Sequence, residues 1–131
     1  MQKLLKYQSL TLAWALFILV ICCASLGKVG NSPVFFEGFD KLTHTGLFFV
    51  LTVLTFSGLI RKQGHIRLST SVFIMVLVIV FLLGGGVEVL QWKVFTYRSG
   101  DWNDLFCDML GSLMGIFSVL VITHAIHSQN K

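Results

Sequence analysis

The uncharged stretch from residue 68 to residue 87 constrains the fold of this chain most strongly. An α-helix rises about 1.5 Å per residue, so this stretch is long enough to cross the roughly 30 Å hydrocarbon core of a bilayer. Hydrophobic residues make up 55% of the sequence and charged residues 12%, too few charges to cover the surface of a soluble domain. The sequence therefore predicts an integral membrane protein.

Three further apolar stretches have comparable lengths, so the sequence predicts an all-α bundle of four transmembrane helices. Open sheets cannot span a bilayer, because their edges would leave backbone polar groups unpaired in lipid. At 131 residues the chain is expected to form a single domain, residues 1–131. The helices are expected at about residues 7–27, 41–60, 68–92 and 103–126.

The distribution of lysine and arginine predicts the orientation. With four helices, one side of the membrane receives Lys3, Lys6, Arg61, Lys62, Arg67 and Lys131. The other side receives Lys28, Lys41, Lys93 and Arg98. The richer side is expected to be cytoplasmic, which places both termini inside. The net charge of +4 does not indicate a nucleic-acid partner, because the basic residues are scattered and form no stripe.

Polar residues gather near three predicted helix ends that must lie at the same membrane face. Asp40 and His44 are four residues apart and share a side of one helix, while Glu88 and Gln91 are three apart on the next. We expect these groups to converge on one polar site. The candidate ligand-binding residues are Asp40, Lys41, His44, Glu88, Gln91, Arg98, Asp104 and Asp108.

Glycines are predicted to bring the helices close together near this site. Gly111 and Gly115 form a GxxxG pair, which allows another helix to approach closely. The run Gly84, Gly85 and Gly86 on the preceding helix offers the complementary surface. We therefore assign these five glycines to helix packing.

Some of the polar residues also have a simpler interpretation. Asp40 is a plausible N-cap of helix 41–60, and Asp40 and Asp104 can both act as caps or first-turn acids. Glu88 and Asp108 are harder to explain in this way, because a charge near mid-bilayer costs roughly 3 kcal/mol. The three cysteines show no metal-binding spacing. No metal site and no cofactor are assigned.

Two segments carry a family resemblance. The first reads Asp40-Lys41-Leu42-Thr43-His44 and precedes an apolar helix with Phe48 and Phe49. The second comprises Glu88-Val-Leu-Gln91, a short aromatic loop to Arg98, and Asp104-Leu-Phe-Cys-Asp108-Met-Leu-Gly111 with Gly115. These segments resemble the VanZ-like family of small bacterial membrane proteins in their order, their spacing and their placement along the chain. The resemblance covers roughly residues 39–117.

The resemblance implies a multi-pass protein of the bacterial cytoplasmic (inner) membrane with a link to the cell envelope. The founding member of the family confers low-level resistance to the glycopeptide teicoplanin, but the family has no settled biochemical activity. The family usually has Asn at the position of Asp108, so a neutral amide role does not carry over there. The extra acid can pair with Arg98 or His44, or can be protonated in the membrane.

Three functions remain open. The leading hypothesis is a non-enzymatic protein that binds a lipid headgroup or a lipid-linked envelope precursor at the outer face, where Lys41 and Arg98 neutralise phosphate. The second is a membrane enzyme acting on a lipid phosphate, with His44 as general base or with a divalent metal held by the carboxylates. The third is an accessory subunit of a larger envelope transport or secretion complex, with a membrane-protein partner.

Overall fold

The computed structural model describes residues 2–23, 38–66, 68–93 and 101–129. These residues form four α-helices, and none of them lies in a strand. The helices are α1 (Gln2–Cys23), α2 (Phe39–Gln63), α3 (Thr70–Lys93) and α4 (Trp102–Gln129). Each is long and apolar enough to cross a membrane, so the predicted all-α fold with four membrane-spanning helices is confirmed.

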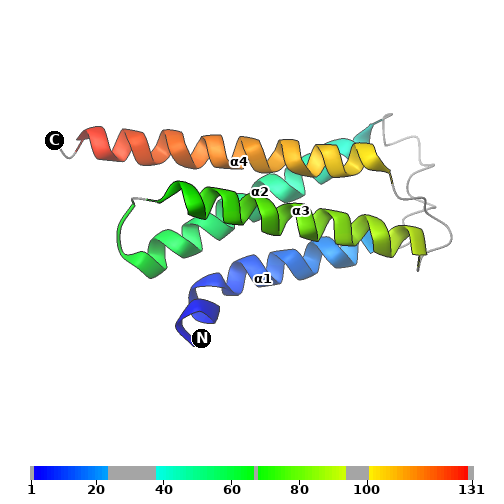
Figure 1. The fold of residues 1–131 in the computed structure, drawn as a ribbon, viewed down its shortest axis with the longest axis horizontal. Helices are drawn as coiled ribbons and strands as arrows, with labels where there is room; N and C mark the ends of the chain where they lie inside the picture. The colour runs from blue at the N-terminus through cyan, green and yellow to red at the C-terminus, as the bar shows by residue number, and fades with distance from the viewer. Residues whose placement is uncertain (1, 24–37, 67, 94–100, 130–131) are drawn as a thin grey trace.

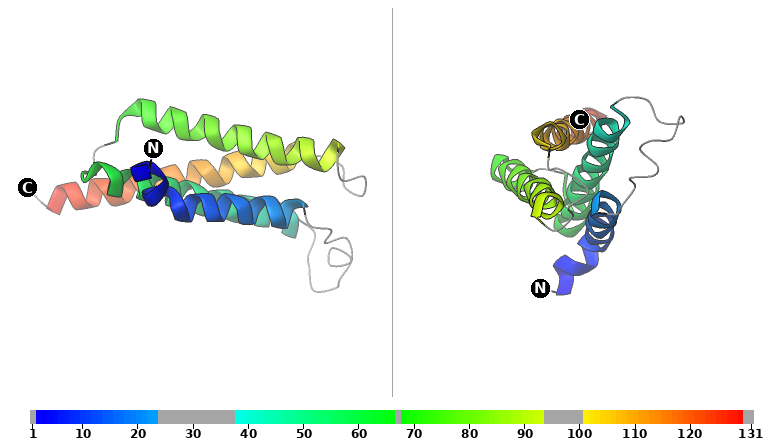
Figure 2. Two further views of the ribbon diagram at one scale, coloured as in Figure 1. Left: turned by 90° about the horizontal axis from the view of Figure 1, so that it is seen from below. Right: turned by 90° about the vertical axis from the view of Figure 1, so that its right-hand side faces the viewer.

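The four helices run lengthwise through one bundle, with α2 oblique to the others (Figure 1). In the end view α2 lies between α4 and α1, and α3 lies along one side (Figure 2). The contact between α2 and α4 is the most extensive in the bundle, followed by that between α1 and α2. The start of α1 and the end of α4 lie at the same end of the bundle (Figure 1). We call the opposite end, where α2 and α4 begin and α3 finishes, the cluster end.

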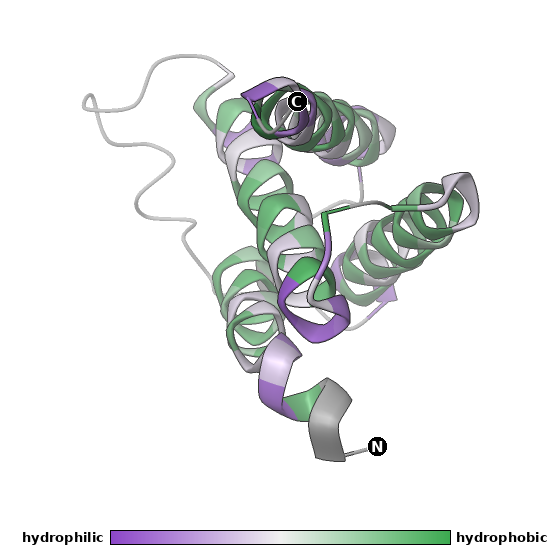
Figure 3. Ribbon diagram, turned by 90° about the vertical axis from the view of Figure 1, so that its left-hand side faces the viewer, coloured by the Kyte–Doolittle hydropathy of each residue, from purple (hydrophilic) through white to green (hydrophobic). Residues whose placement is uncertain are grey.

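The surface of the bundle is apolar along most of its length. Figure 3 shows hydrophobic residues over most of each helix and hydrophilic residues mainly toward the helix ends. Large hydrophobic side chains such as Leu82 on α3 and Phe117 on α4 are exposed. Exposed apolar side chains of this kind are expected where lipid, and not water, is the solvent.

Glycines set both ends of α2. Gly38 at the N-cap and Gly64 at the C-cap have φ angles of 86° and 73°, in the left-handed region that side chains with a Cβ rarely adopt. The predicted N-cap role of Asp40 is therefore wrong: Asp40 lies in the first turn, and Gly38 takes the cap position with no side-chain hydrogen bond. The helix also continues to Gln63, beyond the predicted end at residue 60, so Arg61 and Lys62 lie in its last turn.

The other helices also begin or end away from the predicted positions. α1 begins at Gln2 and not near residue 7, and the predicted residues 24–27 lie outside the described part of the chain. α4 begins at Trp102, and Asp101 before it acts as the cap: its Oδ1 accepts the Asn103 N–H at 2.9 Å. α4 extends three residues beyond the predicted end, to Gln129.

The glycines of α4 lie against α2, not against the glycine run of α3. A Cβ on Gly111 would collide with the Thr45 carbonyl group, and one on Gly115 would lie 3.0 Å from the Phe49 carbonyl oxygen. On α3, a Cβ on Gly85 or Gly86 would meet nothing within 4 Å. The expected pairing of the two glycine surfaces is therefore wrong, because the close approach is between the backbones of α2 and α4.

α1 is held to α2 by polar contacts as well as by packing. Trp14 donates from its indole nitrogen to the Leu47 carbonyl oxygen at 2.9 Å, and Gln8 donates from its side chain to the Thr55 carbonyl oxygen at 3.0 Å. A Cβ on Gly58 would lie 2.7 Å from the Tyr7 carbonyl oxygen, so α1 and α2 also approach closely. These contacts fix α1 beside the helix that carries His44.

Candidate functional site

Seven polar residues from α2, α3 and the start of α4 meet at the cluster end. We call them the polar cluster: Asp40, Lys41, His44, Glu88, Asp101, Asp104 and Asp108. The cluster contains five of the six acidic residues of the whole sequence. Helix geometry explains the meeting, because α2 begins, α3 finishes and α4 begins at this one end.

The outer part of the cluster is organised around Lys41. Its ammonium nitrogen lies 3.5 Å from Asp40 Oδ2, 3.2 Å from Asp101 Oδ2 and 3.5 Å from Asp104 Oδ1. The side chains of Asp40 and Asp101 are 49% and 39% exposed, whereas that of Asp104 is only 5% exposed. Lys41 therefore links the membrane surface to the buried part of the cluster.

The inner part of the cluster is organised around His44. A hydrogen bond of 2.9 Å joins its Nδ1 to Asp108 Oδ1, and its Nε2 lies 3.8 Å from Asp104 Oδ2. His44 and Asp108 are both buried, with side-chain exposures of 3% and 0%. The imidazole is thus fixed between two carboxylates of α4.

Gly84 makes the space for Asp108. A Cβ on Gly84 would lie 2.7 Å from Asp108 Oδ2, so any larger residue there would push the carboxylate away. Asp108 Oδ2 is buried and has no hydrogen-bond partner among the described residues. The carboxylate is therefore held in place by packing on one side and by His44 on the other.

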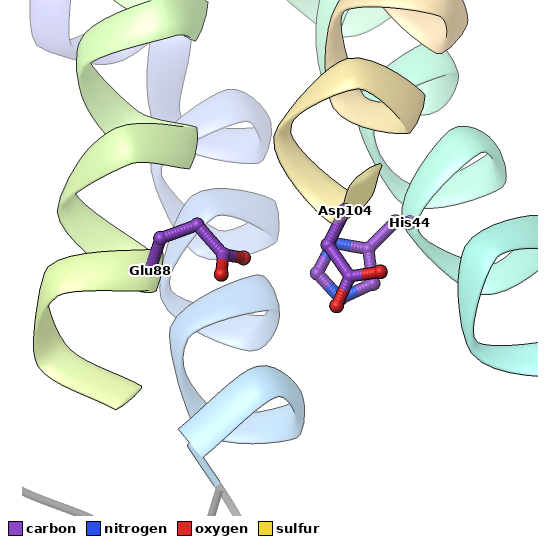
Figure 4. Close-up of side chains that lie close together, drawn as sticks. All are labelled: His44, Glu88 and Asp104. Atoms are coloured by element: carbon purple, nitrogen blue, oxygen red, sulfur yellow. The ribbon is translucent and has the colours of Figure 1, made fainter. Parts of the chain in front are cut away.

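Glu88 reaches the cluster from α3. Its Oε2 accepts the backbone N–H of Asp101 at 2.7 Å, which ties the end of α3 to the start of α4. Its Oε1 is buried and has no hydrogen-bond partner within the described ranges. Figure 4 shows the Glu88 carboxylate pointing toward Asp104 and His44, which lie on the neighbouring helices.

One predicted site residue of α3 does not join the cluster. Gln91 is buried, but its amide donates to the Cys22 carbonyl oxygen on α1 at 2.8 Å. Lys93 is exposed, with its ammonium nitrogen 5.6 Å from the centre of the Trp92 ring. Arg98 lies outside the described residues.

Asp101 is the cluster member that the sequence analysis did not assign to the site. Besides capping α4, it binds Lys41 and presents its backbone N–H to Glu88. The Asn103 N–H and the Lys41 ammonium group hold the pKa of the Asp101 carboxyl below its usual value. The signal was present in the sequence: an Asp two residues before Asn103, at the start of an apolar helix, is a typical N-cap.

An apolar groove leads from the lipid-facing surface to the cluster. It has a volume of about 710 Å³ and lies between the end of α3 and the start of α4. Glu88 and Asp101 belong both to the groove wall and to the polar cluster. The other lining residues are Phe81, Leu82, Gly85, Gly86, Val89, Trp92, Trp102 and Leu105.

A comparison with protein families finds one described as VanZ/LLP1, whose model matches residues 3–123. The match includes α2 and α3 completely, α1 from residue 3, α4 to residue 123, and every residue of the polar cluster. Curated proteins and solved structures give no match.

Proposed function

The chain belongs to the VanZ/LLP1 family, and we propose that it is a bacterial cell-envelope membrane protein that binds a lipid or a lipid-linked envelope precursor. The polar part of the ligand lies at the polar cluster, and its apolar part lies in the groove between α3 and α4. One observation carries this proposal: the groove is continuous with the polar cluster, because Glu88 and Asp101 line the groove and also join the cluster.

The groove suits the apolar part of an amphiphile. Its volume of about 710 Å³ is within the range of roughly 300–1,000 Å³ that is usual for small-ligand sites. Aromatic side chains of Trp92 and Trp102 and aliphatic ones such as Leu82 and Val89 form its walls. Because Gly85 and Gly86 carry no side chain, an acyl or prenyl chain can lie directly against the α3 backbone.

The charges of the cluster favour a headgroup that donates hydrogen bonds. Lys41, which the sequence analysis assigned to a phosphate, already has three carboxylate oxygens within 3.5 Å. Among the described residues that line the groove, the two ionisable ones are Glu88 and Asp101, both acids. We therefore propose a ligand with ammonium or hydroxyl groups, because carboxylates accept hydrogen bonds from such groups and repel phosphate.

A lipid-linked envelope precursor that carries a sugar or an amine has this chemistry. Such a ligand would connect the site to the glycopeptide resistance that the family resemblance implies. The role in glycopeptide resistance is part of this proposal, because it would depend on the ligand bound at this site.

Native mass spectrometry of the full chain, released from detergent with added lipid, tests the proposal. We expect phosphatidylethanolamine, which carries an ammonium group, to be retained more strongly than phosphatidic acid, which does not. Gly85→Leu places a side chain in the groove, where a Cβ has free space, and should abolish this retention. Glu88→Gln should reduce the preference for phosphatidylethanolamine.

Gly46→Leu is the matched control, because Gly46 is an exposed glycine of α2 whose Cβ would also meet nothing within 4 Å. It tests for general effects on the lipid shell around the bundle. Equal retention of both lipids by the wild type, or equal loss in both glycine variants, would contradict the proposed site.

A further inference from the structure

Three potential metal ligands converge inside the polar cluster. His44 of α2, Glu88 of α3 and Asp104 of α4 each offer one ligand atom, and these atoms all lie within 4.8 Å of one another (Figure 4). Ligand atoms around one metal ion, each about 2.0–2.2 Å from it, lie roughly 3–4 Å apart. Small side-chain rotations would therefore bring all three atoms into one coordination shell.

The orientation of His44 is the one that a metal ligand requires. An ionised Asp108 accepts a hydrogen bond from His44 Nδ1–H at 2.9 Å, and this leaves the lone pair on Nε2. Nε2 is the ring nitrogen that faces Asp104, at 3.8 Å from Oδ2. A carboxylate behind the imidazole in this way fixes the tautomer and raises the basicity of the coordinating nitrogen.

A buried oxygen without a partner points independently to a cation. Glu88 Oε2 is occupied by the Asp101 N–H, whereas Oε1 is buried and lacks a hydrogen-bond partner in the described part of the chain. The fully buried Asp108, which supports His44, likewise has an unpartnered oxygen, Oδ2. Unpaired buried carboxylate oxygens are costly, and a divalent cation between Glu88 and His44 would offset that cost.

We propose that His44 Nε2, Glu88 and Asp104 bind a divalent transition-metal ion of the Zn²⁺ or Mn²⁺ type. One imidazole with two carboxylates suits these ions better than Mg²⁺ or Ca²⁺, which prefer oxygen ligands alone. Asp108 is a positioning residue that acts through His44. The inference does not depend on lipid binding, because His44 and Asp104 lie inside the cluster and only Glu88 is shared with the groove wall.

Metal binding by the full chain in detergent tests the proposal directly. After chelation and buffer exchange, equilibrium dialysis against Zn²⁺ or Mn²⁺, with metal measured by mass spectrometry, should give one ion per chain. We expect Glu88→Gln and Asp104→Asn to weaken this binding at least about tenfold, and Asp108→Asn to weaken it by about 10–100-fold through the loss of support for His44.

His124→Ala is the matched control, because His124 is an exposed imidazole of α4 near the opposite end of the bundle. It removes a metal-binding side chain that is not a proposed ligand, so its affinity should stay within about twofold of wild type. Circular dichroism measures the helix content of each variant, and this distinguishes an unfolded variant from a folded one that has lost the metal site. The thermal midpoint provides a second readout: Zn²⁺ or Mn²⁺ should raise it in the wild type and not in Glu88→Gln.

Three outcomes would overturn the proposal. The first is no saturable Zn²⁺ or Mn²⁺ binding by the folded wild type. The second is an unchanged affinity in Glu88→Gln and Asp104→Asn. The third is an equal loss in His124→Ala, which would show that the ion binds to exposed side chains and not to the proposed site.

Discussion

At the scale of the residue, Asp108 is the most unusual position in the chain. Its side chain is fully buried inside a membrane-spanning helix, yet one of its oxygens has no hydrogen-bond partner among the described residues. Gly84 on α3 leaves the space that this oxygen occupies. Such a residue reduces stability, which points to a function, and the proposed support of His44 as a metal ligand would require its negative charge.

We therefore expect Asp108→Asn to stabilise the metal-free protein while weakening its metal binding. The amide oxygen of Asn can still accept the hydrogen bond from His44 Nδ1, and the buried charge is removed. The Asn amide nitrogen would replace Oδ2 as a buried polar group, so the gain comes from removing the buried charge and should be on the order of 1 kcal/mol. Thermal unfolding in chelator-treated detergent solution measures it.

A clear drop in the unfolding midpoint of Asp108→Asn would contradict this expectation. It would indicate that the carboxylate forms a stabilising ion pair with a protonated His44. Glu88→Gln provides the comparison, since Glu88 also has a buried oxygen without a partner in the described ranges but makes no hydrogen bond to His44.

At the scale of the element, the contact between α2 and α4 determines the position of His44. The two backbones approach most closely at Gly111, which faces the Thr45 carbonyl group, next to His44 in the sequence. These two helices contact each other more extensively than any other pair in the bundle. The distance between His44 and Asp108 therefore depends on the small size of a glycine one turn further along α4.

Gly111→Ala should separate the two helices. The added methyl group would collide with the Thr45 carbonyl oxygen, which belongs to the backbone and cannot rotate away. Overpacking of this kind costs about 1–3 kcal/mol, more than the roughly 0.5–1 kcal/mol that alanine gains over glycine in a helix. We expect a lower unfolding midpoint in detergent.

Gly86→Ala is the matched control for this prediction. Gly86 lies within α3 and is exposed, and a Cβ there would meet nothing within 4 Å. The unfolding midpoint of Gly86→Ala should equal that of the wild type or be slightly higher, because only the helix propensity of this position changes. If both substitutions had the same effect, the close approach of α2 and α4 would not be what makes Gly111 necessary.

The sequence predicts which helices meet at the cluster end but not which face each residue presents. Gln91 and Glu88 are three residues apart on α3, yet Glu88 turns toward α4 and Gln91 toward α1. Positions three apart on a helix differ by about 60° around its axis. That difference is enough to separate two neighbours when α3 packs against both α1 and α4.

The sequence pattern likewise does not identify the helix that packs against a glycine pair. The GxxxG spacing of Gly111 and Gly115 indicates a close helix approach, but any helix with a smooth face can supply it. In this bundle the partner is α2, where Thr45 and Thr52 lie against the two glycines. Only the three-dimensional packing selects α2 over the glycine run on α3.

At the scale of the whole molecule, the alternating direction of successive membrane-spanning helices places the start of α2, the end of α3 and the start of α4 at one face. This follows from the order of the helices alone and explains why the convergence of His44, Glu88 and Asp108 could be predicted without coordinates. The exact spans shift by a few residues, since caps such as Gly38 and Asp101 decide them locally. Membrane orientation is a separate property, which depends on charge.

The bundle carries more basic residues at the end opposite the cluster, where Lys6, Arg61 and Lys62 lie. The positive-inside rule therefore predicts that this end is cytoplasmic and that the polar cluster opens at the outer face. Cysteine labelling can test this with two exposed positions, Asn103 at the cluster end and Gln129 at the other. The native cysteines Cys22, Cys23 and Cys107 are first replaced by serine.

In intact spheroplasts, a membrane-impermeant maleimide should label Asn103→Cys and leave Gln129→Cys unlabelled. In inverted membrane vesicles the pattern should reverse, because the cytoplasmic side then faces the reagent. The opposite result would place the polar cluster at the cytoplasmic face. A ligand would then have to come from the inner leaflet, and the cluster would meet envelope precursors before their export and not after it.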